Sequence, residues 1–126
     1  MSSNGPTVLL VEDAQDLGPL LRDTLEEWGR RTLLATNGAE AIELLRHETV
    51  SLMLLDYELP DMSAAGLLER LRSGPLSIPP VVLMTARTRP AEEPWPELVD
   101  VLPKPFELSQ LARMLDRHLP ADVSSR

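Results

Sequence analysis

The sequence predicts an α/β fold in which a parallel β-sheet carries helices on both faces. Short apolar runs alternate with segments of helical periodicity along the chain, and this order builds parallel sheets with right-handed crossovers. The run Leu52–Asp56 is apolar up to its last residue, as expected of a strand that is buried on both faces. Asp56 should therefore stand at the carboxyl edge of the sheet. The pattern gives an open, doubly wound sheet of five strands.

Composition and charge narrow the class of protein. A chain of 126 residues with 43% apolar and 25% charged residues suits one globular domain. The net charge of -8 disfavours nonspecific binding to nucleic acid and to anionic membranes. The absence of cysteine excludes disulfides and thiolate chemistry. No run has the length of a transmembrane helix, and the first residues lack the features of a signal peptide, so we expect a cytoplasmic protein.

The first half of the chain gives two strands and two helices before the central strand. Residues 1–6 are small and polar, and a short flexible tail is expected there. A strand begins at Thr7, and a second covers Thr32–Ala35. The helix between them begins near Pro19 and ends at Gly29, and its predicted apolar face comprises Leu17, Leu20, Leu21, Leu25 and Trp28. Asn37 and Gly38 begin the next helix, with Ala41, Ile42, Leu44 and Leu45 on its inner face.

The second half repeats the alternation. A third helix carries Leu67, Leu68 and Leu71 and ends at the Ser-Gly-Pro sequence 73–75. The fourth strand is Val81–Thr85 and the fifth is Val99–Leu102. The last helix should turn one face to the core, with Leu108, Leu111, Ala112, Leu115 and Leu119 on it. The folded core is expected to cover about 7–119, followed by a second short tail at 120–126.

The segment Arg87–Leu98 interrupts this pattern. A helix is expected between the fourth and fifth strands, but Pro90, Pro94 and Pro96 fall inside the segment. Proline in a helix interior costs about 3 kcal/mol. The sequence therefore predicts that the fourth helix is shortened or replaced by a proline-rich loop.

Acidic, hydroxyl and basic side chains follow the ends of the predicted strands. Glu12 and Asp13 follow the first strand, Asp56 ends the third, Thr85 ends the fourth and Lys104 follows the fifth. In this combination the sequence resembles the receiver domain of response regulators in two-component signalling, over about Thr7 to Leu119. The resemblance implies a flavodoxin-like (CheY-like) sheet with strand order 2-1-3-4-5. In that order the first and third strands are neighbours at the topological switch point.

The resemblance assigns a role to each residue of the acidic group. Asp13 and Asp56 would bind Mg²⁺ directly, Glu12 would act mostly through water, and the main-chain carbonyl of Glu58 would complete the set. Oxygen ligands are those that Mg²⁺ prefers, and three gathered carboxylates attract a cation. Asp56 would be the phosphoacceptor, because a carboxylate can form an aspartyl phosphate.

Further roles concern the phosphoryl group and its surroundings. Thr85 would donate its hydroxyl to a phosphoryl oxygen, and Lys104 would neutralise charge. The resemblance also implies a cis peptide bond before Pro105. Taken singly, each residue also has an ordinary structural role. The acids at positions 12 and 13 can cap the first helix, Thr85 suits a strand, and Lys104 suits a surface.

Some positions depart from the family pattern or vary in the family. Val101 stands where receivers carry a Tyr or Phe that rotates on activation, and Ala64 replaces a glycine. Glu58 and Arg87 occupy positions that tune the lifetime of the phosphoryl group, and we expect them to pair across the mouth of the site. Trp95 is the large apolar residue of the proline-rich segment; it is either an anchor for a partner or a lid packed on the sheet.

Three functions fit the sequence. The leading one is a stand-alone receiver that takes phosphate from a histidine kinase or a His-containing phosphotransfer protein. It would signal to an unidentified protein as a monomer or weak dimer. It would not be an enzyme beyond self-catalysed phosphoryl transfer. An alternative is a pseudo-receiver that acts as an unphosphorylated scaffold, which the missing aromatic favours. A hydrolase with an aspartyl nucleophile would need a second Asp two residues after the first, where Glu58 stands.

Overall fold

The computed structural model describes residues 6–86 and 95–119. Its five parallel strands form one sheet in the order β2-β1-β3-β4-β5. The strands are β1 Thr7–Val11, β2 Arg31–Ala35, β3 Leu52–Asp56, β4 Val81–Thr85 and β5 Leu98–Pro103. The helices are α1 Leu17–Glu27, α2 Gly38–His47, α3 Ala64–Ser73 and α4 Leu108–His118. The predicted doubly wound fold and its strand order are confirmed.

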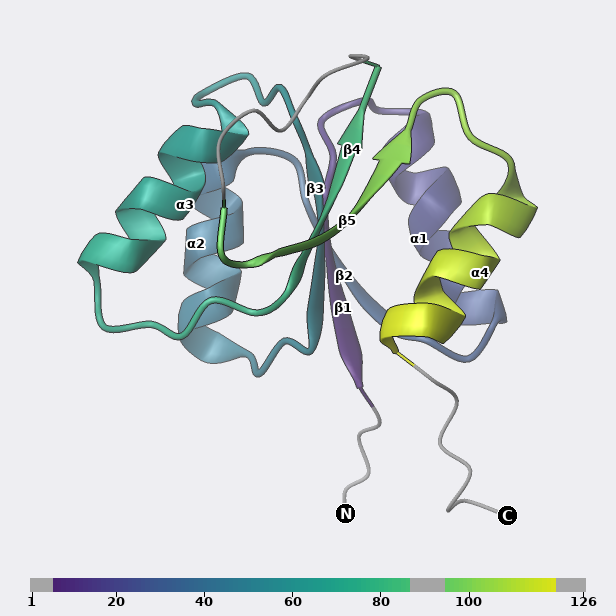
Figure 1. The fold of residues 1–126 in the computed structure, drawn as a ribbon, viewed down its shortest axis with the longest axis horizontal. Coiled ribbons are helices and arrows are strands. Elements are labelled where there is room, and N and C mark those ends of the chain that lie inside the picture. Colours follow the sequence, from purple (N-terminus) through teal and green to yellow (C-terminus); the bar gives the residue numbers. More distant parts are fainter. Residues whose placement is uncertain (1–5, 87–94, 120–126) are drawn as a thin grey trace.

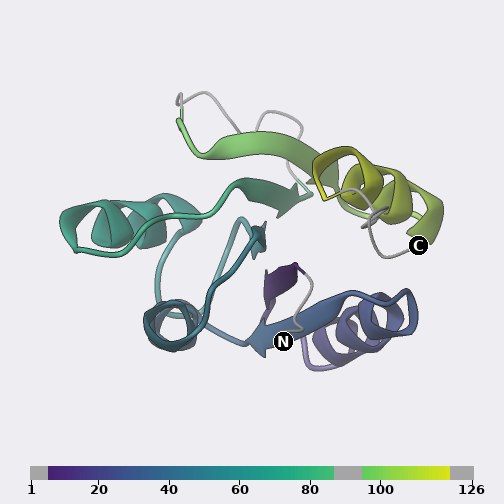
Figure 2. The ribbon, with the colours of Figure 1, turned by 90° about the horizontal axis from the view of Figure 1, so that it is seen from below.

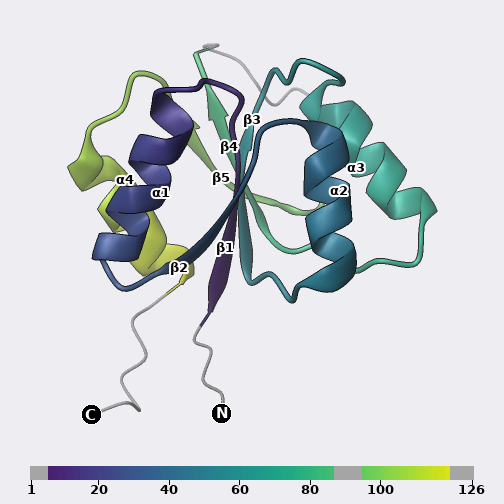
Figure 3. The same ribbon diagram turned by 180° about the vertical axis from the view of Figure 1, so that it is seen from behind.

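The sheet forms the middle of three layers. Helices α1 and α4 cover one face, and α2 and α3 cover the other (Figures 1 and 3). Seen along the sheet in Figure 2, the strands lie between the two pairs of helices. All residues of β1, β3 and β4 are buried, which explains why these strands read as uninterrupted apolar runs.

Alternate residues of each strand point to opposite faces, and this alternation divides the core in two. Leu10 of β1 and Leu54 of β3 pack with Leu25 of α1 and Leu115 of α4. Their neighbours in the sequence, such as Leu55, pack on the other face with α2 and α3. The two cores hold the strands in register, with Val11 of β1 beside Leu55 of β3.

The exact buried faces of α1 and α4 differ from the prediction. Leu20 is 60% exposed and Trp28 is 39% exposed, because α1 buries the line through Leu21 and Leu25 and ends before Trp28. In α4 the first residue, Leu108, is 48% exposed, whereas Met114 is buried. Leucines at the end of a helix, or about 100° from its buried line, satisfy a periodicity count without reaching the core.

The interval between β4 and β5 agrees with the predicted loss of a helix. Within the part of the chain that the structure describes, neither residue 86 nor residues 95–97 are helical, and the helices number four where the resemblance implied five. Leu98 donates its N–H to the carbonyl of Trp95 as β5 begins. Over the same described ranges, the helices are too short and too polar to cross a bilayer.

Candidate functional site

The carboxyl ends of β1, β3, β4 and β5 meet at one edge of the sheet, toward which the arrows of β4 and β5 point in Figure 1. Because parallel strands end at the same edge, residues far apart in sequence become neighbours there. Glu12 follows β1, Asp56 ends β3, Thr85 ends β4 and Lys104 follows β5. The strand order brings β1 and β3 side by side, and so unites the two acidic segments.

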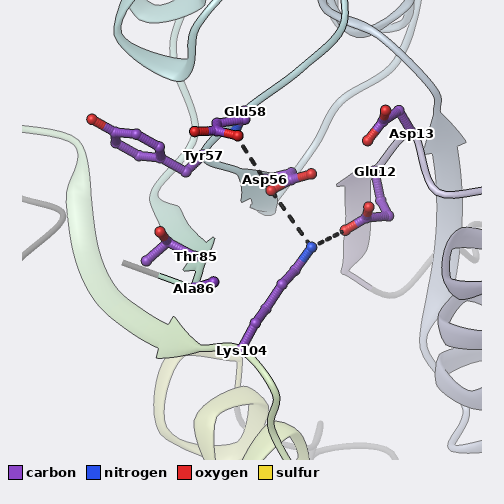
Figure 4. A pocket seen from close by; sticks show the side chains of 8 residues that line it. All are labelled: Glu12, Asp13, Asp56, Tyr57, Glu58, Thr85, Ala86 and Lys104. Carbon is purple, nitrogen blue, oxygen red and sulfur yellow. Dashed lines mark hydrogen bonds and ion pairs between the residues drawn. The ribbon is translucent and has the colours of Figure 1, made fainter. Parts of the chain in front are cut away.

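These strand ends surround an open cavity of about 390 Å³. We refer to it as the acidic pocket, and its lining residues are Glu12, Asp13, Asp56, Tyr57, Glu58, Thr85, Ala86 and Lys104. Figure 4 shows the side chain of Lys104 reaching between Glu12 and Asp56, with Asp13 beyond Glu12 and with Thr85 and Tyr57 on the opposite side. A cavity of this size is large enough for a small ligand, and its lining consists mainly of charged and polar side chains.

Lys104 bridges the two buried carboxylates. Its Nζ lies 2.8 Å from Oε1 of Glu12 and 3.5 Å from Oδ1 of Asp56. Burial opposes the charged amine, but the hydrogen bond and charge of Glu12 and the charge of Asp56 outweigh it, so the pKa of Lys104 lies above its ordinary value. The ammonium therefore stays charged at neutral pH and offsets part of the negative charge in the pocket.

Asp56 is the central acid of the pocket. It is only 8% exposed. Burial and the neighbouring charge of Glu12 raise the pKa of Asp56 to about 6, against the opposing effect of Lys104. The sequence predicted its position at the end of β3, and the structure adds that it is buried there. Such a carboxylate is poorly solvated and gains from any cation that reaches it.

One carboxylate oxygen each from Glu12, Asp13 and Asp56 lie within 4.8 Å of one another. Glu12 is buried and is oriented by the N–H of Ala14, which donates to its Oε2 at 3.2 Å. Asp13 is exposed at the rim. Three oxygen donors in one open pocket, with room for water molecules, are a suitable donor set for Mg²⁺. The residues that were predicted to bind a metal therefore lie together.

The loop after β3 brings Glu58 to the same pocket. The N–H of Glu58 points to Oδ1 of Asp56 at 3.5 Å, and Tyr57 is held by its N–H bond of 2.9 Å to the carbonyl of Met84. Tyr57 lines the pocket together with Ala86, and neither was predicted. Both directly follow a strand that ends in a predicted site residue, which is the sequence signal that could have indicated them.

Backbone contacts between β4 and β5 hold Thr85 beside Lys104. The N–H of Lys104 donates to the carbonyl of Thr85 at 2.7 Å, and Thr85 itself is buried. The peptide bond between Lys104 and Pro105 is cis, the isomer that the resemblance implied. The hydroxyl and the ammonium group therefore enter the pocket from adjacent strand ends.

Two of the predicted switch residues, Val101 and Trp95, lie outside the acidic pocket. Val101 and Trp95 are half-buried and pack against the core between the sheet and helices α2 and α3. Trp95 is thus packed on the domain, and its roles as an anchor for a partner or as a lid both stay predictions. Arg87 lies outside the described residues, so its predicted pairing with Glu58 stays a prediction.

Comparison with protein families matches residues 8–116 to the response regulator receiver domain. The match covers most of the chain, and the chain therefore belongs to the response regulator receiver domain family. The prediction that it resembles such a domain, within two-component signal transduction, is confirmed.

Individual proteins give the same assignment. The chain is 32% identical over 118 residues to the transcriptional regulatory protein CrdR of Helicobacter pylori, covering 91% of this chain and 55% of that protein. It is 35% identical over 107 residues to the transcriptional regulatory protein CpxR of Escherichia coli, covering 82% and 45%. The chain thus spans about half the length of these curated relatives.

Solved structures share the fold. A two-component response regulator from Clostridium difficile has a TM-score of 0.79 and 25% identity, with 92% of this chain and 97% of that one covered. The receiver domain of the sensor histidine kinase PA1611 from Pseudomonas aeruginosa has a TM-score of 0.76 and 25% identity, covering 90% and 97%. That structure has a magnesium ion coordinated in its active site cleft.

Proposed function

We propose that this chain is the phosphoacceptor of a two-component phosphorelay and that Asp56 carries the phosphoryl group. The observation that supports this most directly is the buried carboxylate of Asp56, 3.5 Å from the ammonium of Lys104, at the centre of an open pocket. The donor would be a phosphohistidine of a histidine kinase or phosphotransfer protein. An Asp56 oxygen bonds to phosphorus, the phosphorus–nitrogen bond breaks, and the imidazole leaves with its electron pair.

The acidic pocket would hold Mg²⁺ during this transfer. The ligands would be Asp13 and Asp56 directly, Glu12 through water, and the main-chain carbonyl of Glu58. Four carboxylate side chains and one ammonium group line the pocket, so negative charge is in excess there, and this supports a bound cation. When bound, Mg²⁺ neutralises charge on the oxygens of the transferring group.

The chain's own residues would orient and neutralise the phosphoryl group. The ammonium group of Lys104 lies 2.8 Å from Glu12 and 3.5 Å from Asp56, and it would contact an oxygen of a phosphoryl group on Asp56. The hydroxyl of Thr85 would donate to another oxygen. Glu58, at the pocket rim, together with Arg87, would limit the access of water and so set the lifetime of the aspartyl phosphate.

The output would pass through protein–protein contacts of this domain. Phosphorylation and its loss would be self-catalysed single events, with no turnover of a separate substrate. The net charge of -8 argues against direct contact of this domain with nucleic acid, although relatives are named as transcriptional regulators. A kinase partner implies a cytoplasmic site, and a monomer or weak dimer would suffice for these contacts.

A second candidate is a pseudo-receiver that binds partners without being phosphorylated. It is favoured by Val101, which is half-buried on β5 where the family usually carries a rotating aromatic ring. The two candidates differ in one property, which is the ability of Asp56 to accept phosphate.

Incubation with acetyl phosphate and Mg²⁺, followed by mass spectrometry of the intact protein, tests the proposal. We expect a gain of one phosphate that requires Mg²⁺ and is lost in Asp56→Asn. The matched control is Asp100→Asn, which removes another half-buried strand carboxylate that lies outside the acidic pocket, and it should be phosphorylated like the wild type. No gain of mass with acetyl phosphate or with a phosphorylated histidine protein would favour the scaffold.

A further inference from the structure

The tip of the loop between β3 and α3 is fastened to the first turn of α2. Oδ1 of Asp61 accepts the N–H of Gly38 at 2.8 Å, and Oδ2 accepts the N–H of Ala39 at 3.0 Å. The first N–H groups of a helix have no partner within the helix, and its amino end attracts negative charge. These two hydrogen bonds, chiefly the one from Gly38, lower the pKa of Asp61. The carboxylate of Asp61 is therefore charged when it makes this contact.

Met62 adds a packing contact at the same place. A Cβ atom on Gly38 would lie 2.5 Å from the Sδ atom of Met62, so the methionine occupies space that glycine alone leaves open. Gly38 is buried beneath it. Two consecutive loop residues, Asp61 and Met62, therefore contact a single turn of α2, one through hydrogen bonds and the other through close packing.

The loop transmits this attachment to the acidic pocket. Its two limbs are joined by a β-bridge between Glu58 and Ser63 and by the N–H of Ala64, which donates to the carbonyl of Tyr57 at 3.2 Å. The limb that carries Glu58 directs its N–H to Oδ1 of Asp56. Because hydrogen bonds join the two limbs, the position of the loop tip influences the position of Glu58 beside Asp56.

We propose that Asp61 is a positioning residue: by binding the loop to the amino end of α2, it holds Glu58 in place and sets the affinity of the acidic pocket for a divalent cation. The inference rests on the proposed function for the identity of the cation site. Groups that orient metal ligands without touching the metal commonly change its affinity by 10- to 100-fold. Asp61 lies at the tip of the loop and is not part of the pocket lining.

A comparison of two caps of the same helix tests the proposal. Asp61→Ala removes the two hydrogen bonds that attach the loop to α2. Asn37→Ala removes a hydrogen bond of 2.8 Å from the Glu40 N–H to Oδ1 of Asn37, which is local to the start of α2 and does not involve the loop. Both variants lose a cap and should lose thermal stability. We expect the dissociation constant for Mg²⁺, measured by calorimetry, to rise about tenfold in Asp61→Ala and to stay unchanged in Asn37→Ala.

Hydrogen exchange without any cation gives an independent measurement. The amide of Glu58 should exchange faster in Asp61→Ala than in the wild type and Asn37→Ala, with Asp61→Asn intermediate because its amide oxygen keeps one acceptor. Circular dichroism verifies that each variant is folded. An equal effect of both caps on Mg²⁺ affinity and on exchange at Glu58, or no effect of either, would overturn the proposal. A wild type that binds no Mg²⁺ would contradict the proposed function, while exchange at Glu58 would still decide the role of Asp61.

Discussion

The ammonium group of Lys104 is bound to the buried carboxylate of Glu12, with 2.8 Å between Nζ and Oε1. Lys104 is the single lysine of the sequence, so a spectroscopic label on lysine reports this residue alone. This ion pair connects the end of β1 to the residue that follows β5, and it affects the pKa of Lys104.

Replacing Glu12 by Gln should lower the pKa of Lys104. In the wild type burial lowers the pKa of Lys104, but the hydrogen bonds and charges of Glu12 and Asp56 together raise it above its ordinary value. In Glu12→Gln the burial remains and one opposite charge is gone. A pH titration of protein labelled with ¹³C at the lysine ε-carbon measures both values by NMR. Asp100→Asn serves as the control and should titrate like the wild type; an unchanged pKa in Glu12→Gln would contradict the assignment of its cause.

Asp56→Asn should stabilise the protein at neutral pH in the absence of divalent cations. The pKa of Asp56 is raised from 3.8 to about 6 in the folded state, so the fold holds a proton that the unfolded chain releases between these values. Stability from this group is present at low pH and is lost as the pH rises through about 6. The gain in Asp56→Asn at pH 7.5 should be about 1–3 kcal/mol and should shrink toward pH 4, as measured by urea unfolding in chelator.

Asp61→Asn provides a control of opposite sign for that experiment. The pKa of Asp61 is lowered by the N–H groups of α2, chiefly that of Gly38. Its charged form therefore stabilises the fold at pH values above the pKa of the unfolded chain, and this stabilisation is lost as the pH falls. Asp61→Asn should therefore be destabilised at neutral pH and approach the wild type in acid. If both Asp→Asn variants changed the free energy of unfolding in the same direction, the loss of a negative charge would control stability, and the surroundings of each carboxylate would not.

Asp13→Ala should weaken Mg²⁺ binding, and the affinity of the wild type should fall as the pH drops below about 6. Asp13 contributes one of three oxygens that lie within 4.8 Å of one another, and below the pKa of Asp56 a proton competes with the cation. Calorimetric titration at two pH values measures both effects. Asp23→Ala removes an exposed acid on α1 and should bind Mg²⁺ normally; equal affinity of Asp13→Ala and wild type would contradict the ligand assignment.

The site was predictable from sequence because its residues stand at fixed places in a simple pattern. Asp56 and Thr85 each end an apolar run, and the ends of parallel strands share one edge. The prediction that Glu12 lies beside Asp56 depended on the strand order, which came from the resemblance and not from the pattern. The positions of the charges around Lys104 could be seen only in the structure.

Other features depend on contacts that no local pattern encodes. The attachment of Asp61 to Gly38 joins residues 23 positions apart, and a carboxylate after a proline looks like an ordinary loop residue. Leu20 and Leu108 satisfied helical spacing but are exposed, since periodicity locates a face to within about one residue position. The packing of Trp95 on the core was one of two alternatives that the sequence left open.

The last prediction is that a phosphoryl mimic at Asp56 changes the surroundings of Trp95. Val101 is β-branched and stiff on its strand, so it cannot signal by the large rotation that an aromatic ring performs. Thr85 is followed closely by the segment Arg87–Leu98, and Trp95, near the end of this segment, packs against the same core cluster as Val101. A movement of Thr85 toward a phosphoryl group should therefore reach Trp95 through the backbone. Loops are common switch elements.

Arg72 and Glu97 determine how firmly the end of that segment is held. Arg72 of α3 donates from Nε and Nη2 to the two oxygens of Glu97, at 3.0 and 2.7 Å. The pair is partly exposed and contributes little to overall stability, so Glu97→Gln should loosen the attachment of Trp95 without unfolding the domain. In a Trp28→Phe background Trp95 is the single tryptophan, and excitation that is selective for tryptophan reports on it alone. We expect Glu97→Gln to shift its emission to the red and to increase its quenching by acrylamide.

Beryllium fluoride with Mg²⁺, a phosphoryl mimic, tests the switch in the same background. The emission of Trp95 and the hydrogen exchange of Leu98, whose N–H is bound to the Trp95 carbonyl at 3.1 Å, should both change when the mimic is added. Asp56→Asn should abolish the response, and Leu20→Ala, on the exposed face of α1, should retain it. If emission and exchange are the same with and without the mimic in a protein that binds it, Trp95 is a fixed lid and the output surface lies on another part of the domain.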